Sequence, residues 1–185
     1  IITLEKQENY LHKPIRKTYN LVGHSDIEKF MLDSIKSRRI HHAYLLSGIK
    51  GIGKATFAHR ISKYILSNLY GDNMEIDKND RNIDLINNES HPDFMVLAKD
   101  SHNKKNIIEI NQVRKCIEFF NHTPIISKFK ICIIDSIDDM NINSANAILK
   151  ILEEPPKNSL FFIIAHNRET VLQTGLHHRI RAKFE

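Results

Sequence analysis

The sequence has little of several features that would point to specialised classes of protein. It contains no tryptophan, two cysteines, six glycines and five prolines in 185 residues. Cys116 and Cys132 are isolated, with no CxxC pair, so the sequence predicts neither a disulfide framework nor a cysteine zinc site. The low glycine and proline content argues against long disordered segments. No apolar run reaches the roughly 18 residues of a membrane span, so we expect a cytoplasmic chain with no membrane contact.

The residues that are present indicate a globular domain. Hydrophobic residues make up 41% of the chain, which allows a substantial core at this length. The net charge is +5 and the pI is about 9.1, but the charges are scattered and no run of Lys or Arg stands out. This charge is compatible with nucleic acid or an acidic partner. The sequence shows no recognition helix or basic stripe of a sequence-specific DNA binder.

Short apolar runs alternate with stretches of helical periodicity along the chain. The expected strands are 43–47, 93–98, 129–135 and 159–165, and the expected helices are 26–39, 54–70, 109–122 and 144–154. Such alternation predicts an α/β fold, with a parallel sheet and helices on both of its faces. Residues 1–20 are expected to form an N-terminal arm before a domain over 21–185, and the Asn-rich, charged segment 71–90 a surface loop.

The segment LLSGIKGIGKAT (45–56) has the spacing of a phosphate-binding loop between an expected strand and an expected helix. Its glycines allow backbone N–H groups to point at phosphates, and the helix N-terminus adds a partial positive charge. Lys54 is placed to reach the terminal phosphates. The alternative is a glycine-rich turn with a solvated lysine. The candidate nucleotide-binding residues are Gly48, Gly51, Gly53, Lys54, Ala55, Thr56 and Asp135.

One position of this loop departs from the pattern. Ala55 stands where a Ser or Thr hydroxyl normally holds a magnesium ion, and a methyl group cannot coordinate a metal. Thr56 is a poor substitute, because it lies about 100° further round the helix.

The acidic position expected at the end of the strand 129–135 is also incomplete. Asp135 can assist a metal through water, but it is followed by Ser136 rather than by a glutamate that activates the attacking water. A serine cannot act as a general base near neutral pH without a helping neighbour. Asp138 and Asp139 are expected to project from the following loop. Two groups that hydrolysis needs are therefore absent, which points to a non-hydrolysing subunit.

The string SANAILKILEEPP (144–156) is distinctive and appears with RRIHHAYLLSGIKGIGKATFAHR (38–60), SHPDFMVL (90–97) and IIDSIDDMN (133–141). In these strings the chain resembles the delta-prime family of bacterial DNA polymerase III clamp-loader subunits, over about residues 20 to 185. The resemblance implies a P-loop AAA+ domain with a five-stranded parallel sheet of order 5-1-4-3-2. It also implies a rigid subunit that does not hydrolyse ATP and works with motor and delta subunits. Their complex loads the sliding clamp onto primer–template DNA.

The family presents an arginine in trans to the ATP site of a neighbouring motor subunit. Arg179 in the stretch VLQTGLHHRIRAKFE (171–185) is the candidate for this arginine finger, although the Ser and Cys of the family motif are missing. Arg181 is an alternative, and a surface arginine without a role in trans is another. The segment around Leu21, Val22 and Gly23 would contact adenine.

The resemblance also sets expectations for cofactors and extent. Many relatives carry a four-cysteine zinc module between the loop helix and the second strand, but residues 71–90 contain no cysteine, so no zinc or other metal is expected. The helical lid and the C-terminal collar of the family are expected to be missing, because the sequence stops at Glu185. We therefore expect weak ATP or ADP binding and no required cofactor. The chain itself is expected to be non-catalytic and shows no polymerase site, although the holoenzyme is a DNA-directed DNA polymerase, a nucleotidyltransferase.

Three functions stay open at this point. The first is the non-hydrolysing clamp-loader subunit, and the second is an active AAA+ ATPase motor of the same or a related complex, against which Ala55 and Ser136 argue. The third is a small-molecule phosphotransferase on a P-loop scaffold. It predicts an acceptor pocket and a mobile lid that the sequence does not show.

Overall fold

The computed structural model describes residues 23, 25–67, 74, 76–77, 79–99, 106–173 and 182–184. Within them the strands β1 (Ala43–Ser47), β2 (Phe94–Ala98), β3 (Lys130–Asp135), β4 (Ser159–Ala165) and β5 (Ala182–Phe184) form one sheet. Their order is β2-β3-β4-β1-β5, which from the opposite edge reads 5-1-4-3-2, as the resemblance implied. All four neighbouring pairs are parallel. The expected α/β class with a parallel sheet is confirmed.

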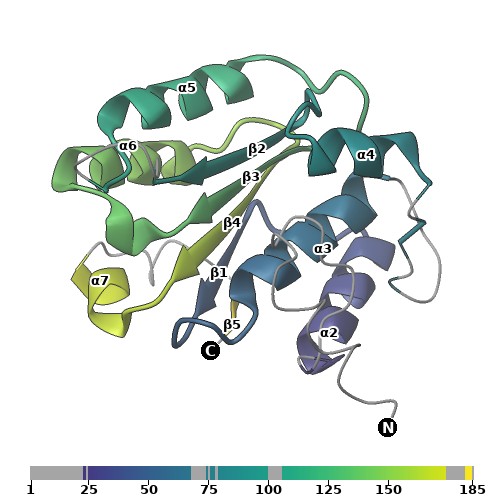
Figure 1. The fold of residues 1–185 in the computed structure, drawn as a ribbon, viewed down its shortest axis with the longest axis horizontal. Coiled ribbons are helices and arrows are strands. Elements are labelled where there is room, and N and C mark those ends of the chain that lie inside the picture. Colours follow the sequence, from purple (N-terminus) through teal and green to yellow (C-terminus); the bar gives the residue numbers. More distant parts are fainter. Residues whose placement is uncertain are drawn as a thin grey trace, which may run out of the picture.

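Helices cover both faces of this sheet (Figure 1). On one face lie α5 (Ile110–Asn121) and α6 (Ile142–Glu153), and on the other α2 (Ser25–Lys36) and α3 (Lys54–Leu66). Three shorter helices complete the described structure: α4 (Arg81–Asn87), the 3-10 helix η2 (Ile137–Asp139) and α7 (Arg168–Gln173). Among the described residues, no helix has both the length and the apolar character needed to cross a membrane.

The sheet separates two hydrophobic cores. Because successive side chains of a strand point to opposite faces, Tyr44 and Leu46 of β1 join the core under α2 and α3, whereas Leu45 joins the core under α5 and α6. The same alternation divides Phe162 from Phe161 in β4. Every residue of β4 is buried, which explains its continuously apolar sequence.

The prediction of a surface loop over 71–90 is wrong for part of that segment. Residues Arg81–Asn87 form α4, which begins after Asp80. The Asp80 side chain accepts a hydrogen bond from the Asn82 N–H and so caps the helix. Ile83 and Ile86 are one turn apart and both fully buried. Two buried apolar residues and one cap are enough here, because α4 packs against α3.

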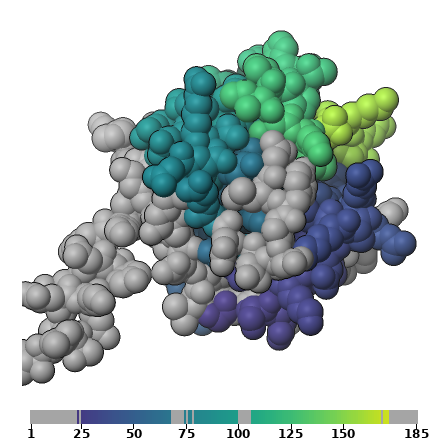
Figure 2. Space-filling view, turned by 90° about the vertical axis from the view of Figure 1, so that its right-hand side faces the viewer, coloured from purple at the N-terminus to yellow at the C-terminus, as the bar shows by residue number. Residues whose placement is uncertain are grey.

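At the α4 end of the molecule, the segment after α5 lies beside α4 (Figure 2). Asn82 of α4 and Ser127 of that segment both donate to the carbonyl of Leu66, the last residue of α3. Ser127 also donates its N–H to the buried carboxylate of Asp93, which precedes β2. These contacts fix the end of the sheet opposite the candidate nucleotide-binding loop.

Candidate nucleotide-binding site

The loop between β1 and α3 has the backbone that its glycines predict. Gly48, Gly51 and Gly53 have φ values of 143°, 94° and 97°. Gly53 is the N-cap of α3 in the left-handed region, with no side-chain cap, so the helix N-terminus stays open. A Cβ added at Gly48 would lie 2.8 Å from Cδ1 of Ile52, a side-chain end that can move aside, so it is the positive φ that favours glycine here.

Lys54 is folded into this loop. Its Nζ donates to the carbonyls of Gly48 and Ile49, both at 2.6 Å, and the residue is only 9% exposed. Burial lowers the pKa of Lys54, whereas the carboxylates of Asp138 and Asp135 oppose this shift. The amine therefore lies at the centre of the loop, between backbone carbonyls and two nearby acidic groups. A bound phosphate would have to compete with the two carbonyls for it.

The two residues after Lys54 differ in their surroundings. Ala55 is half-buried and packs against the core under α2 and α3. Thr56 is also half-buried, one position further along α3. The helix thus presents a methyl group at the position where phosphate-binding loops carry a metal-binding hydroxyl.

Asp135 ends β3 at the same edge of the sheet as the loop. In the register of the sheet, Ile164 of β4 pairs with Leu46 of β1 on one side and with Asp135 on the other. Burial raises the pKa of Asp135 above its ordinary value, and the positive charge of Lys54 is one of the neighbours that oppose the rise. The structure therefore brings together the phosphate-binding loop and the strand-end aspartate that the sequence singled out.

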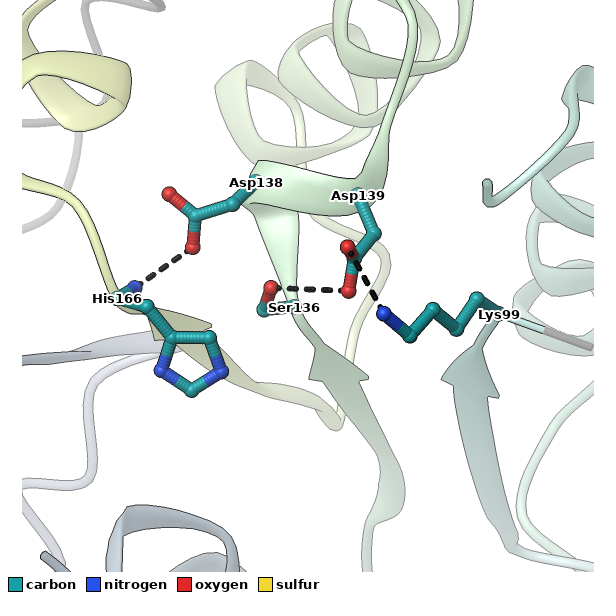
Figure 3. A network of polar contacts seen from close by, with 5 residues as sticks. All are labelled: Lys99, Ser136, Asp138, Asp139 and His166. Atoms are coloured by element: carbon teal, nitrogen blue, oxygen red, sulfur yellow. Dashed lines mark hydrogen bonds and ion pairs between the residues drawn. The ribbon is translucent and has the colours of Figure 1, made fainter. Parts of the chain in front are cut away.

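The two aspartates after β3 have structural partners (Figure 3). Asp138 accepts the backbone N–H groups of His166, at 2.6 Å, and Asn167, at 3.1 Å, directly after β4. Asp139 accepts the Ser136 hydroxyl at 3.3 Å and pairs with Lys99 at 3.4 Å. The carboxylates thus hold the ends of β2, β3 and β4 together, instead of extending freely as activators of water.

Ser136 stands at the position where the hydrolytic glutamate would be expected. It is 1% exposed, and its hydroxyl bonds to Asp139. The chain therefore has a buried serine hydroxyl, not a carboxylate, at this position.

Several expected site residues lie outside the described residues. These are Arg179 and Arg181, the candidate arginine fingers, and Leu21 and Val22 of the expected adenine contact. Gly23 of that contact is described, with a φ of 86°, and a Cβ added there would meet no described atom within 4 Å.

The described residues bring no three His, Cys, Asp or Glu side chains together as metal ligands. His91 has a structural contact, since its Nδ1 accepts the N–H of Asp93. Zinc binding and nucleotide binding are not tested by these contacts, and the expectations for both stay predictions.

The string 144–156 has a structural role that its spacing alone did not show. Ser144 is fully buried, and its hydroxyl donates to the carbonyl of Ile108, just before α5. Its N–H donates to the side chain of Asn141, the N-cap of α6. Ile108 in turn donates its N–H to the Asp139 carbonyl at 2.7 Å. The string therefore locks α6 and the start of α5 to the loop that follows β3.

The strand order, the glycine loop at the start of α3 and the aspartate at the end of β3 define a P-loop domain with the AAA+ fold. A sequence profile described as "DNA polymerase III, delta subunit" matches residues 23–180. The chain belongs to this family of clamp-loader proteins.

Individual relatives agree with this assignment. The DNA polymerase III subunit delta' of Bacillus subtilis is 32% identical over 148 residues, covering 80% of this chain and 43% of the relative. The subunit tau/gamma of Haemophilus influenzae is 28% identical over 171 residues, covering 90% of this chain and 24% of the relative. This chain thus spans less than half the length of these two curated relatives.

Among solved structures, a DNA polymerase III gamma subunit-related protein from Thermotoga maritima has a similar fold. Its TM-score is 0.60 at 19% identity, and the match covers 84% of this chain and 46% of that one. Both delta' and tau/gamma subunits are thus similar to this chain, so similarity does not separate these two kinds of subunit.

Proposed function

We propose that this domain is the nucleotide-site-bearing part of a non-hydrolysing, delta-prime-type stator of a clamp loader. The observation that carries the proposal is the residue that follows Asp135, which is Ser136. Ser136 is buried and bonded to Asp139, while Asp138 holds the backbone after β4. No glutamate follows the strand, and the nearby carboxylates are engaged elsewhere. Ala55 removes the metal-binding hydroxyl as well.

The wider role follows from the relatives rather than from the contacts of this chain. As a stator, it would act in the cytoplasm with motor and delta subunits, and through their complex on the sliding clamp and primer–template DNA. Arg179, or else Arg181, would supply positive charge to the ATP site of a neighbouring motor. An arginine finger raises the rate of such reactions by a factor of about 10³–10⁵. Arg179→Ala in a reconstituted complex is therefore expected to lower the ATPase rate of the motor and leave complex assembly unchanged.

The competing function is an active ATPase motor, favoured by the intact geometry of the glycine loop and Lys54. Titration calorimetry with ATP, with and without magnesium, and phosphate release on the same samples separate the two. The variants are Lys54→Ala and, as a matched control, Lys115→Ala, an exposed lysine on α5. The stator predicts ATP binding that depends on Lys54 and no phosphate release.

Each other result has a definite meaning. Magnesium-dependent turnover that Lys54→Ala abolishes, and Lys115→Ala does not, would refute the stator and establish a motor. No ATP binding by the wild-type chain would show that the loop is architectural in this domain.

A further inference from the structure

The two cysteines, 16 positions apart in the sequence, meet inside the fold. Cys116 on α5 and Cys132 on β3 are both free thiols and fully buried. Their sulfur atoms lie 3.5 Å apart, in hydrogen-bond contact. The Cys132 thiol in turn lies 3.7 Å from the carbonyl oxygen of Ile133. The sequence predicted two unrelated cysteines, whereas the structure places them in contact.

This contact is close to what a disulfide requires. A disulfide has an S–S length of about 2.05 Å, so the two sulfur atoms need to approach by only about 1.5 Å. Closing this gap requires rotation of the two side chains or a shift of α5. Two sulfur atoms are too few for a structural zinc site, and no third ligand joins them among the described residues. Oxidation of the dithiol is therefore the chemistry that this geometry favours.

We propose that Cys116 and Cys132 are a redox modification site, at which a two-electron oxidant such as a peroxide forms an intrachain disulfide between α5 and β3. The peroxide first oxidises one thiol to a sulfenic acid and leaves as water or an alcohol. The second thiol then attacks the sulfenic sulfur, the S–S bond forms, and the sulfenic oxygen leaves as water with the two remaining protons. Two thiols lose two electrons in total, and one peroxide is reduced.

The surroundings of the pair determine when it reacts. The hydrogen bond with Cys116 and complete burial raise the pKa of the Cys132 thiol well above its ordinary value. Because the thiolate is the reactive form, the closed fold keeps the pair reduced. A peroxide reaches one sulfur when α5 opens briefly, the native contact then brings the second thiol to the sulfenic acid, and the reaction is faster at higher pH. Once formed, the bond closes the segment 116–132 and fixes the second half of α5 to the central part of the sheet.

Peptide mapping tests this site directly. The folded protein is treated with hydrogen peroxide or diamide, remaining thiols are alkylated, and the sample is digested with trypsin without reductant. Cleavage after Lys115, Lys128, Lys130 and Lys150 releases residues 116–128 and 131–150 as separate peptides, each with one cysteine. We expect one disulfide-linked peptide that contains both, from a chain that stays monomeric and that reductant separates again.

Two controls make the result decisive. Cys116→Ala and Cys132→Ala each remove the linked peptide, and any cross-linked dimers of these variants measure reaction between chains. The oxidised wild type is expected to unfold at a higher urea concentration than the reduced form, because closing a loop of this length restricts the unfolded chain. Alkylation of both cysteines without any linked peptide would overturn the proposal. Linkage that forms only in urea would overturn it as well, since the native contact would not be its cause.

Discussion

Lys63 is a fully buried lysine on α3, and its titration gives a sharp test of the packing described above. Burial lowers the pKa of its side chain from 10.5 to about 8. Because the folded chain holds this proton less tightly than the unfolded chain, the unfolded chain binds more protons between pH 8 and pH 10.5. The contribution of Lys63 to stability therefore rises with pH across this window.

The size of the effect follows from the shift. One pKa unit corresponds to about 1.4 kcal/mol, so burying the charged amine costs about 3 kcal/mol at pH 7. The same linkage gives a remaining cost of about 1.4 kcal/mol at pH 9.5. Lys63→Met keeps an unbranched side chain and removes the titration. The variant is expected to be more stable than the wild type at pH 7, and this advantage is expected to shrink by about 2 kcal/mol by pH 9.5.

Urea unfolding followed by circular dichroism at several pH values from 7 to 9.5 measures this difference. Lys29→Met, at an exposed position of α2, controls for the loss of one positive charge. A stability difference between Lys63→Met and the wild type that stays constant over this pH range would refute the reasoning. It would mean that the Lys63 amine keeps its proton in the folded chain, through water or through an acidic partner.

Three further outcomes are expected. Asp93→Asn should lower the free energy of unfolding, measured in urea, by about 2–4 kcal/mol. The reason is that an amide cannot accept hydrogen bonds from all three backbone N–H groups that the buried carboxylate accepts. A loss below about 0.5 kcal/mol would contradict this. Asp138→Ala should lower the free energy of unfolding by about 1–3 kcal/mol, since two backbone N–H donors after β4 lose their acceptor. An unchanged midpoint of urea unfolding would show that water replaces the carboxylate. Ala55→Thr should make ATP binding, measured by calorimetry, more dependent on magnesium, but it should give no phosphate release. ATP turnover by this single variant would show that Ser136 does not prevent hydrolysis.

The sequence predicted β1 to β4 well, because each of these four strands is a short apolar run. The expected bounds of β1 and β4 agree with the structure residue for residue. Helix ends were less accurate: α6 begins at Ile142, two residues before the expected start, because the Asn141 side chain caps it. No sequence pattern predicted α7, a six-residue helix that follows β4. Local patterns therefore determine the sheet, while caps and short helices depend on single contacts.

The polar framework around the site could not be predicted in this way, because its contacts join distant parts of the chain. The Asp93 carboxylate accepts from Ile125, 32 positions later, and Asp138 accepts from His166, 28 positions later. The sequence predicted that Asp138 would project from its loop, and only the position of β4 reveals its partner. The loop glycines and Lys54, by contrast, were predictable, since one continuous motif contains them all.

The state of Lys54 bears on why the chain keeps this loop without the groups for hydrolysis. The amine donates to the carbonyls of Gly48 and Ile49. A phosphate that enters must replace these two contacts and gains the N–H groups at the start of α3 in return. Phosphate binding would then be an exchange of partners for the Lys54 amine. Lys54→Met separates the two uses of the residue: a loss of stability without ATP would show that the lysine supports the loop, and a loss of ATP affinity at unchanged stability would show that it serves the phosphate.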